Sequence, residues 1–162
     1  MNDENAASPR RGVVAVVQRE GRLLVIRRSA AVVAPLAYCF PGGGIEAGES
    51  EEAALVRELA EELHAQVRPL KLIWRSTTPW GVELAWWLAD LLSEVRANPA
   101  EVDAWQWSTP EEMSRLPNLL ESNREFLAKL AQGAIALEPD APEPGALEPA
   151  RPVSSVPPQS AR

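Results

Sequence analysis

Acidic side chains and one arginine gather in the segment 49–62, which holds Glu49, Arg57, Glu58, Glu61 and Glu62. Residues 51–63 have helical periodicity, and a helical wheel places the last three acids in one wedge beside an apolar stripe. Like charges at i and i+4 cost about 0.2–0.5 kcal/mol, and acids near a helix C-terminus cost about 0.3–1 kcal/mol each. Carboxylates without His or Cys on the same face are typical ligands of Mg²⁺ or Mn²⁺. The pattern indicates a metal site, with a solvated acidic face as the alternative.

A glycine-rich segment precedes this helix and contains Gly42, Gly43, Gly44 and Gly48. Glycine allows the backbone to approach a ligand closely and to adopt positive φ. Alone, such a segment is typical of any loop. Its position directly before the acidic helix is what suggests a role in binding.

The two segments together resemble the signature of a known superfamily. Gly43 is followed after five residues by Glu49, and after seven more by Arg57-Glu58-Leu59-Ala60-Glu61-Glu62. With the preceding Phe40-Pro41-Gly42, this pattern resembles the Nudix box of the Nudix hydrolase (MutT-like) superfamily. The resemblance implies an α+β protein with the Nudix fold, a mixed β-sheet sandwich flanked by helices (α/β/α). It further implies a Mg²⁺- or Mn²⁺-dependent pyrophosphohydrolase that cleaves a phosphoanhydride bond in a nucleoside diphosphate linked to another group.

The resemblance assigns a role to each position of the box. It makes Glu58, Glu61 and Glu62 metal ligands, and Gly43 a backbone contact to the metal or the phosphates. A metal so held would neutralise the diphosphate and acidify the attacking water. A Nudix-fold module that binds or senses a nucleotide without turnover is the alternative function.

Three further residues complete the expected catalytic group. By resemblance, Arg57 orients the carboxylates and Glu49 supports the helix through Arg57. A carboxylate must accept a proton from the attacking water. In the family this base lies within the box, where Glu61 is the candidate, or on a later loop, where Glu101 is the candidate. A solvent-facing loop acid is the alternative for Glu101.

The sequence departs from the box at its end, where His64 replaces the usual glycine. That glycine resembles a helix C-cap in the left-handed conformation. Histidine tolerates this conformation better than most residues, at some cost. The departure is therefore expected to affect local stability and not the metal chemistry.

Substrate choice is less determined. Asn123 lies where MutT-like hydrolases of oxidised dGTP place a base-reading asparagine, and Trp80 lies in a turn from which it could stack on a base. Patterns typical of coenzyme A and dinucleoside polyphosphate hydrolases are missing, and Pro79 is not clearly in register with the ADP-ribose pyrophosphatase mark. The adjacent Trp86 and Trp87 should face opposite sides of a strand, one in the core and the other free to line a substrate surface or a dimer contact. We therefore expect a small nucleotide as the substrate, and a homodimer is possible.

Strands and helices that would position these residues can be placed coarsely. A hairpin is predicted from the strands Gly12–Gln18 and Arg22–Arg28, and a loop is predicted over residues 29–41. Thr109, Pro110 and Glu112 form a capping signature for a helix start. The remaining elements are strands at Val67–Arg75, Val82–Asp90 and Ala104–Trp107 and a last helix from about Leu119 to Ala131 that stops at Gly133.

Composition limits the function classes. The formal net charge is −7 and the pI about 4.8, which disfavours binding to nucleic acid or anionic membranes. The longest apolar stretches are too short to span a membrane. Cys39 is the only cysteine, so an intramolecular disulfide is excluded and a reducing, cytoplasmic setting is expected. Residues 1–11 and the proline-rich 132–162 are predicted to be disordered, around a Nudix domain at 12–131. The tail is expected to be a spacer, or else a partner-binding motif.

Overall fold

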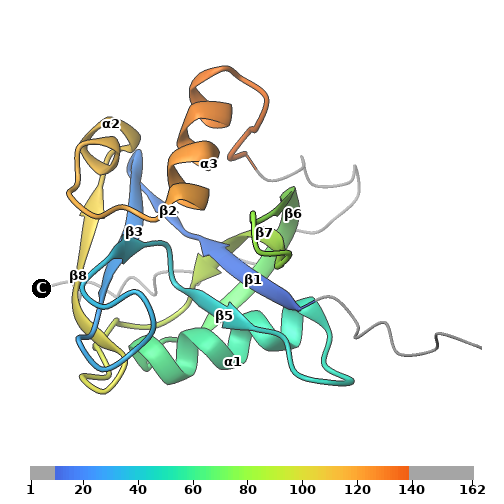
Figure 1. The fold of residues 1–162 in the computed structure, drawn as a ribbon, viewed down its shortest axis with the longest axis vertical. Coiled ribbons are helices and arrows are strands. Elements are labelled where there is room, and N and C mark those ends of the chain that lie inside the picture. The colour runs from blue at the N-terminus through green and yellow to red at the C-terminus, as the bar shows by residue number, and fades with distance from the viewer. Residues whose placement is uncertain (1–9, 139–162) are drawn as a thin grey trace, which may run out of the picture.

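The computed structural model describes residues 10–138 (Figure 1). Its strands and helices follow in the order β1 (Arg11–Val16), β2 (Gln18–Arg19), β3 (Arg22–Arg28), β4 (Tyr38–Cys39), β5 (Gly42–Gly44), α1 (Glu51–Leu63), β6 (Val67–Thr77), β7 (Glu83–Leu91), β8 (Val102–Ser108), α2 (Pro110–Ser114) and α3 (Glu121–Ala131). Within the described residues, no helix is long and apolar enough to cross a membrane.

Two small sheets form the centre of the molecule. One has the strand order β5-β1-β7-β6, with β1 and β7 parallel and the other pairs antiparallel. In the other, β3 pairs antiparallel with β2, β4 and β8. Helix α1 covers one side of the strands and α3 lies on the opposite side (Figure 1). The expected mixed α+β sandwich with helices on both faces is confirmed.

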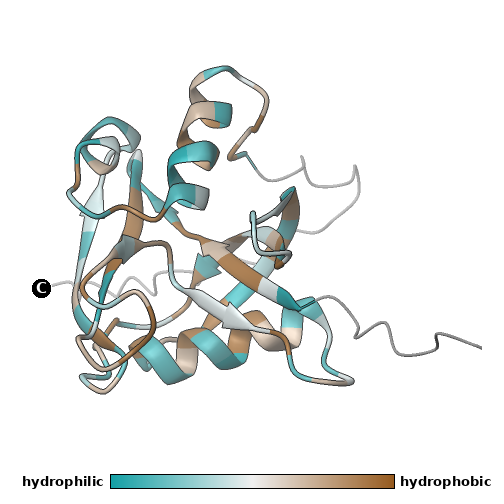
Figure 2. Ribbon diagram, in the orientation of Figure 1, coloured by the Kyte–Doolittle hydropathy of each residue, from teal (hydrophilic) through white to brown (hydrophobic). Residues whose placement is uncertain are grey.

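Both faces of the central strands are buried, which explains their nearly continuous apolar sequences. On β1, Val13 and Ala15 pack in the core beneath α1, whereas Val14 and Val16 pack in the core beneath α3. Figure 2 shows β1 as largely hydrophobic, while α1 alternates between hydrophilic and hydrophobic positions. The alternating side chains of each central strand therefore connect the acidic helix rigidly to the opposite layer.

Aromatic side chains fill the core on the α3 side. The ring of Trp86 stacks on Phe126 with centroids 4.8 Å apart, and Phe40 meets Phe126 edge-on at 5.3 Å. Trp87 faces the other core, so the expectation that Trp86 and Trp87 point to opposite sides is confirmed. Such aromatic pairs contribute about 0.5–1.5 kcal/mol each beyond their buried area. They anchor the strand end that leads from Phe40 into the glycine-rich segment.

The predicted hairpin is wrong over most of its length. Only the two-residue β2 pairs with β3 across the turn, whereas β1 pairs with β5 and β7 in the other sheet. The chain changes sheets near Val17, which is itself fully buried. The long loop predicted at 29–41 and the glycine turn also contain short strands, β4 and β5. These pairings join segments far apart in the sequence, which local patterns do not report.

The packed part of the chain extends slightly beyond 12–131. Strand β1 begins at Arg11, and Ile135 is 4% exposed because it packs in the aromatic core. The rest of the segments predicted to be disordered, 1–9 and 139–162, lies outside the described residues.

Three predicted helix ends are confirmed, both ends of α1 and the start of α2. Helix α1 begins and ends as predicted, and α2 carries the capping box in which the Thr109 side chain and the Glu112 side chain each accept a backbone N–H from the other residue. His64 caps α1 in the left-handed conformation, at φ 47° and ψ 28°, with its N–H donated to the carbonyl of Ala60. His64 therefore takes the conformation that the glycine of the Nudix box would adopt.

Replacing His64 with glycine should stabilise the protein. The left-handed conformation costs an L-residue about 1–2 kcal/mol, part of which is offset because glycine gives the unfolded chain more freedom. We expect His64→Gly to raise the free energy of unfolding by roughly 0.5–1 kcal/mol in urea denaturation. Gln132→Gly is the control, since Gln132 caps α3 in the right-handed conformation and its replacement should lower stability. Equal or lower stability of His64→Gly would contradict this account.

Candidate active site

The N-cap and the buried leucines of helix α1 fix the direction in which its acidic face points. The side chain of Ser50 accepts a hydrogen bond from the N–H of Ala53 at 3.1 Å and starts the helix. Leu55, Leu59 and Leu63 are completely buried in the core. This packing holds the neighbouring face of α1, which carries the acids, against the glycine-rich segment of β5.

Three carboxylates line one small cavity of about 180 Å³. Glu58 and Glu62 enter it from α1, and Glu101 enters it from the loop before β8. Gly43 and Arg28 also contribute to its wall, and the complete lining is Ile26, Arg28, Val32, Gly42, Gly43, Glu58, Glu62 and Glu101. The structure thus brings together two of the predicted ligands with the predicted later-loop acid.

The charges of these carboxylates are disfavoured in the protein alone. Burial, together with the neighbouring charges of Glu58 and Glu101, raises the pKa of Glu62 to about 8, against the opposing effect of the N–H of Gly42. Burial also raises the pKa of Glu58, which Arg57 opposes. Glu62 is only 6% exposed, yet its Oε2 receives just one long hydrogen bond, 3.3 Å from the N–H of Gly42. A positive charge in this cavity would favour the ionised form of each carboxylate.

Arg57 organises the acids around the mouth of the site. Its guanidinium donates to both oxygens of Glu49 at 2.8 Å and to the carbonyl of Gly44 at 2.8 Å. It also donates to Glu58 at 2.9 Å and to Glu61 at 3.3 Å. The hydrogen bonds from Arg57, followed by the N–H of Glu46, lower the pKa of Glu49 to about 2. Arg57 therefore ties the helix to the glycine-rich segment and orients the Glu58 carboxylate.

Glu61 lies apart from the cavity. Its side chain is 48% exposed and it is not among the residues that line the cavity. It shares Arg57 with Glu58 at the rim of the site. The Glu61 carboxylate therefore lies near Glu58 but outside the cavity that Glu58, Glu62 and Glu101 line.

Gly43 is needed for the approach of helix and strand. A Cβ atom at this position would lie 2.3 Å from Cδ of Glu58 and 2.5 Å from each of its carboxylate oxygens. No non-hydrogen atom beyond the chain neighbours lies within 4 Å of the corresponding position at Gly44. The Glu58 carboxylate therefore occupies the space that any other residue at position 43 would fill.

Glu101 reaches the site because its loop is fastened to the end of α1. Asn98 donates its backbone N–H to the carbonyl of Glu62 at 2.8 Å and its side-chain amide to the carbonyl of Glu61 at 3.0 Å. The carbonyl of Asn98 accepts the N–H of Glu101 at 3.0 Å, and the N–H of Ser29 donates to the carbonyl of Glu101 at 2.9 Å. Sequence reasoning missed Asn98, because nothing in its neighbours indicates that it meets a helix far away in the chain.

A larger cleft of about 480 Å³ adjoins the acidic cavity. The two share Arg28, Gly42 and Gly43 in their walls. The cleft is mostly apolar, with Phe40, Leu84 and Leu120 among its lining and three arginines, Arg10, Arg11 and Arg28, along it. Its volume and largely apolar lining suit an organic group attached to an anion at the glycine-rich strand.

Asn123 and Trp80 have different positions relative to this cleft. Asn123 lines it and is 3% exposed, and its Oδ1 accepts the N–H of Phe40 at 2.8 Å. Trp80 is 68% exposed in the turn between β6 and β7, and is not part of the lining, although Val82 is. Only the first of the two predicted substrate-binding residues faces the cleft.

Arg28 is a candidate functional residue that sequence reasoning missed. Its Nε donates to the carbonyl of Val33 at 2.7 Å, and it lies in the wall of both cavities. Its charge acts against the upward shift of the pKa of Glu62. In the sequence, Arg28 is a second arginine after Arg27 near the end of a predicted strand, a pattern typical of surface residues. Only the fold shows that Arg28 lies between the two cavities.

Comparisons with known proteins agree with this geometry. A sequence model of the NUDIX domain matches residues 8–130. An RNA pyrophosphohydrolase of Edwardsiella ictaluri is 30% identical over 66% of this chain and 71% of its own length. The CTP pyrophosphohydrolase of Escherichia coli is 32% identical over 65% of this chain and 79% of its own length.

Solved structures show the same fold. The MutT NUDIX hydrolase of Burkholderia pseudomallei has a TM-score of 0.67 and 26% identity, covering 76% of this chain and 98% of its own. The E. coli ORF135 protein has a TM-score of 0.66 and 28% identity, covering 76% and 89%. The chain therefore belongs to the Nudix family of hydrolases, enzymes that cleave phosphoanhydride bonds.

Proposed function

We propose that the protein is a divalent-metal-dependent pyrophosphohydrolase whose substrate is a nucleoside triphosphate, oxidised or not, or another nucleoside diphosphate derivative. The observation that carries this proposal is the arrangement of two cavities along one glycine-rich strand. The acidic cavity holds Glu58, Glu62 and Glu101, and the adjoining cleft can hold a nucleoside. A diphosphate lying across Gly42 and Gly43 would connect the two.

The donor set fits Mg²⁺ or Mn²⁺. Within residues 10–138, no three His, Cys, Asp or Glu side chains already stand in a cluster that could hold a metal ion. The carboxylates that line the cavity are nevertheless oxygen donors without a thiolate or imidazole among them, which favours hard cations. Glu58 and Glu62 would hold the ion, with Glu61 at the rim and the Gly43 backbone beside it. When bound, the ion would supply charge neutralisation of the diphosphate and a more acidic water.

The protein's own side chains supply the remaining chemistry. Glu101 lines the cavity with Glu58 and Glu62 from a separate loop, and we assign it the role of accepting the proton of the attacking water. Arg57 orients Glu58, supported by Glu49. Arg28 lies between the two cavities, where its guanidinium can pair with a phosphate oxygen.

The nucleoside end would occupy the larger cleft. Asn123 lines this cleft. Its Oδ1 accepts the N–H of Phe40 and its amide nitrogen donates to the Ser122 hydroxyl at 3.2 Å, so base recognition can use only the second amide hydrogen and the second lone pair of Oδ1. Trp80 can act on a base only if the exposed turn that carries it folds over the substrate. We therefore assign the larger share of recognition to Asn123.

A substrate panel tests the proposal. The purified protein would be incubated with Mg²⁺ and then Mn²⁺ and nucleoside triphosphates, including CTP and oxidised dGTP. ADP-ribose, dinucleoside polyphosphates, coenzyme A and RNA with a 5′-triphosphate complete the panel. The relatives include RNA and CTP pyrophosphohydrolases, and the net charge of −7 favours a free nucleotide over RNA. If one of these compounds raises the Tm of the protein but none of them is converted to product, the alternative function, a nucleotide-binding module without turnover, is supported.

Asn98 should matter for the rate because it fastens the Glu101 loop to α1. We expect Asn98→Ala to lower kcat by about 10–100-fold, as for other residues that orient a site. In a Glu101→Gln background the same substitution should change kcat little, because the carboxylate that it positions is already gone. Steady-state kinetics of the four proteins measure this coupling.

Ser93→Ala is the matched control for this cycle. Ser93 precedes Asn98 in the same connection, and its hydroxyl accepts the N–H of Gln66 at 2.8 Å, away from Glu101. This variant should keep kcat. Equal effects of Asn98→Ala with and without Glu101 would show that Asn98 does not act through Glu101.

A further inference from the structure

Ser29 is a buried polar residue that has no role in the chemistry proposed above. It immediately follows the last residue of β3 and is 5% exposed. Its hydroxyl donates a hydrogen bond to the carbonyl of Ala100 at 2.9 Å and accepts the N–H of Ala31 at 3.2 Å. Its backbone N–H donates to the carbonyl of Glu101 at 2.9 Å. Ser29 therefore holds two consecutive carbonyls of the loop that carries Glu101.

These two carbonyls belong to the peptide units on either side of the Glu101 Cα atom. Because a peptide unit is planar, the orientations of the units before and after a residue define its φ and ψ. The Ser29 hydroxyl holds the unit before Glu101, and the Ser29 N–H holds the unit after it. The direction of the Glu101 Cα–Cβ bond, which leads into the acidic cavity, follows from these two contacts.

A β-bulge interrupts the pairing of β3 and β8 next to these contacts. Arg28 pairs with Val102, whereas Arg27 pairs with Ala104. Asp103 is therefore an extra residue in β8, and its carboxylate accepts hydrogen bonds from the guanidinium of Arg27. The extra residue shifts the pairing of the preceding part of the chain by one position.

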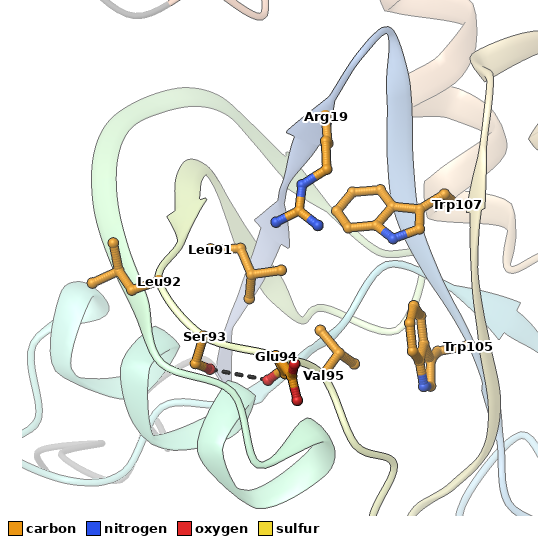
Figure 3. A pocket seen from close by; sticks show the side chains of 8 residues that line it. All are labelled: Arg19, Leu91, Leu92, Ser93, Glu94, Val95, Trp105 and Trp107. Carbon is orange, nitrogen blue, oxygen red and sulfur yellow. Dashed lines mark hydrogen bonds between the residues drawn. The ribbon is translucent and has the colours of Figure 1, made fainter.

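This shift brings Glu101 to Ser29. Regular pairing without the extra residue would place Val102 opposite Ser29. Bulges are common next to active sites, where they redirect a side chain. Further along β8, Trp105 and Trp107 line a separate groove, which shares no residue with the acidic cavity (Figure 3). Only the start of β8, before the bulge, therefore serves the active site.

We propose that Ser29 is a positioning residue that orients the Glu101 carboxylate for proton transfer, a role that rests on the proposed function of Glu101 as the base. Ser29 holds the loop from the side of β3, whereas Asn98 holds it from the end of α1. Loss of the Ser29 hydroxyl releases the peptide unit before Glu101, while the backbone N–H still holds the unit after it. A displaced catalytic carboxylate slows the chemical step and leaves substrate binding unchanged.

Two measurements on a Ser29→Ala variant of the full-length protein test this role. The three-bond coupling between the amide proton and Hα of Glu101 reports its φ, and we expect this coupling to shift toward an averaged value. Steady-state kinetics would use the nucleotide of the substrate panel that the wild-type protein hydrolyses fastest. We expect kcat to fall about tenfold at unchanged KM, as for other residues that orient a site.

Ser108→Ala is the matched control. Ser108 is also buried, at 1% exposure, and lies at the other end of β8. Its hydroxyl accepts the side-chain amide of Gln106 at 2.7 Å, so the variant loses a comparable hydrogen bond away from Glu101. Both the coupling at Glu101 and kcat should be retained. In a Glu101→Gln background, Ser29→Ala should change kcat little.

The two measurements separate the failure of this proposal from failure of the proposed function. An unchanged coupling at Glu101 in Ser29→Ala, or a changed coupling with unchanged kcat, would overturn the role of Ser29. So would an equal loss of kcat with and without the Glu101 carboxylate. If the wild-type protein hydrolyses no compound of the panel, the proposed function fails, whereas the coupling still decides whether Ser29 fixes the φ of Glu101.

Discussion

Glu62→Gln is expected to lower kcat by about a thousandfold without unfolding the protein. A metal ligand contributes several kcal/mol of transition-state stabilisation, and each 1.36 kcal/mol corresponds to about a tenfold rate change. Glutamine preserves the shape of a side chain that is 6% exposed while removing a charge that burial disfavours. The free energy of unfolding without metal should therefore stay unchanged or rise. Steady-state kinetics and urea denaturation measure the two effects.

Metal-induced stabilisation distinguishes a lost ligand from a general defect. Millimolar Mg²⁺ should raise the Tm of the wild-type protein, and it should raise the Tm of Glu62→Gln much less. Glu52→Gln is the matched control, because Glu52 lies exposed in the first turn of the same helix. That variant should keep both kcat and the response to Mg²⁺. Full activity of Glu62→Gln would refute the assignment of the site.

Gly43→Ala is the second change with a large expected effect. Its Cβ would overlap the Glu58 carboxylate, the end of a flexible side chain, so the carboxylate must move while the backbone stays in place. Since a displacement of about 1 Å in a catalytic group can cost about a hundredfold, we expect kcat to fall at least about a hundredfold. The Tm without metal should change little.

The neighbouring glycines provide controls with opposite outcomes. Gly44→Ala meets no non-hydrogen atom within 4 Å beyond its chain neighbours and should be nearly neutral in rate and Tm. At Gly42, where φ is +156°, a Cβ would lie 2.1 Å from the carbonyl oxygen of Val13, so Gly42→Ala should lower the Tm strongly. Equal activity of Gly43→Ala and Gly44→Ala would show that the Glu58 carboxylate does not need its observed position.

Local interactions explain what could be predicted from the sequence alone. The bounds of α1, the capping box at Thr109 and the left-handed conformation of His64 were all predictable, because each depends on residues within a few positions along the chain. The spacing of the Nudix box likewise placed Glu58 and Glu62 on one face of the helix. The opposite orientations of Trp86 and Trp87 follow from the period of a β-strand.

Only the tertiary structure decided which of these groups meet. The pairing of β1 with β5 and β7, in place of the predicted hairpin, brings Gly43 against Glu58, and the contact of Asn98 with the end of α1 brings Glu101 into the same cavity. Arg28 and the exposed position of Trp80 also became clear only in the fold. The physical reason is that these contacts join segments tens of residues apart, and they form because both faces of the central strands must be buried. Periodicity and capping report a residue's immediate neighbours and carry no information about such distant partners.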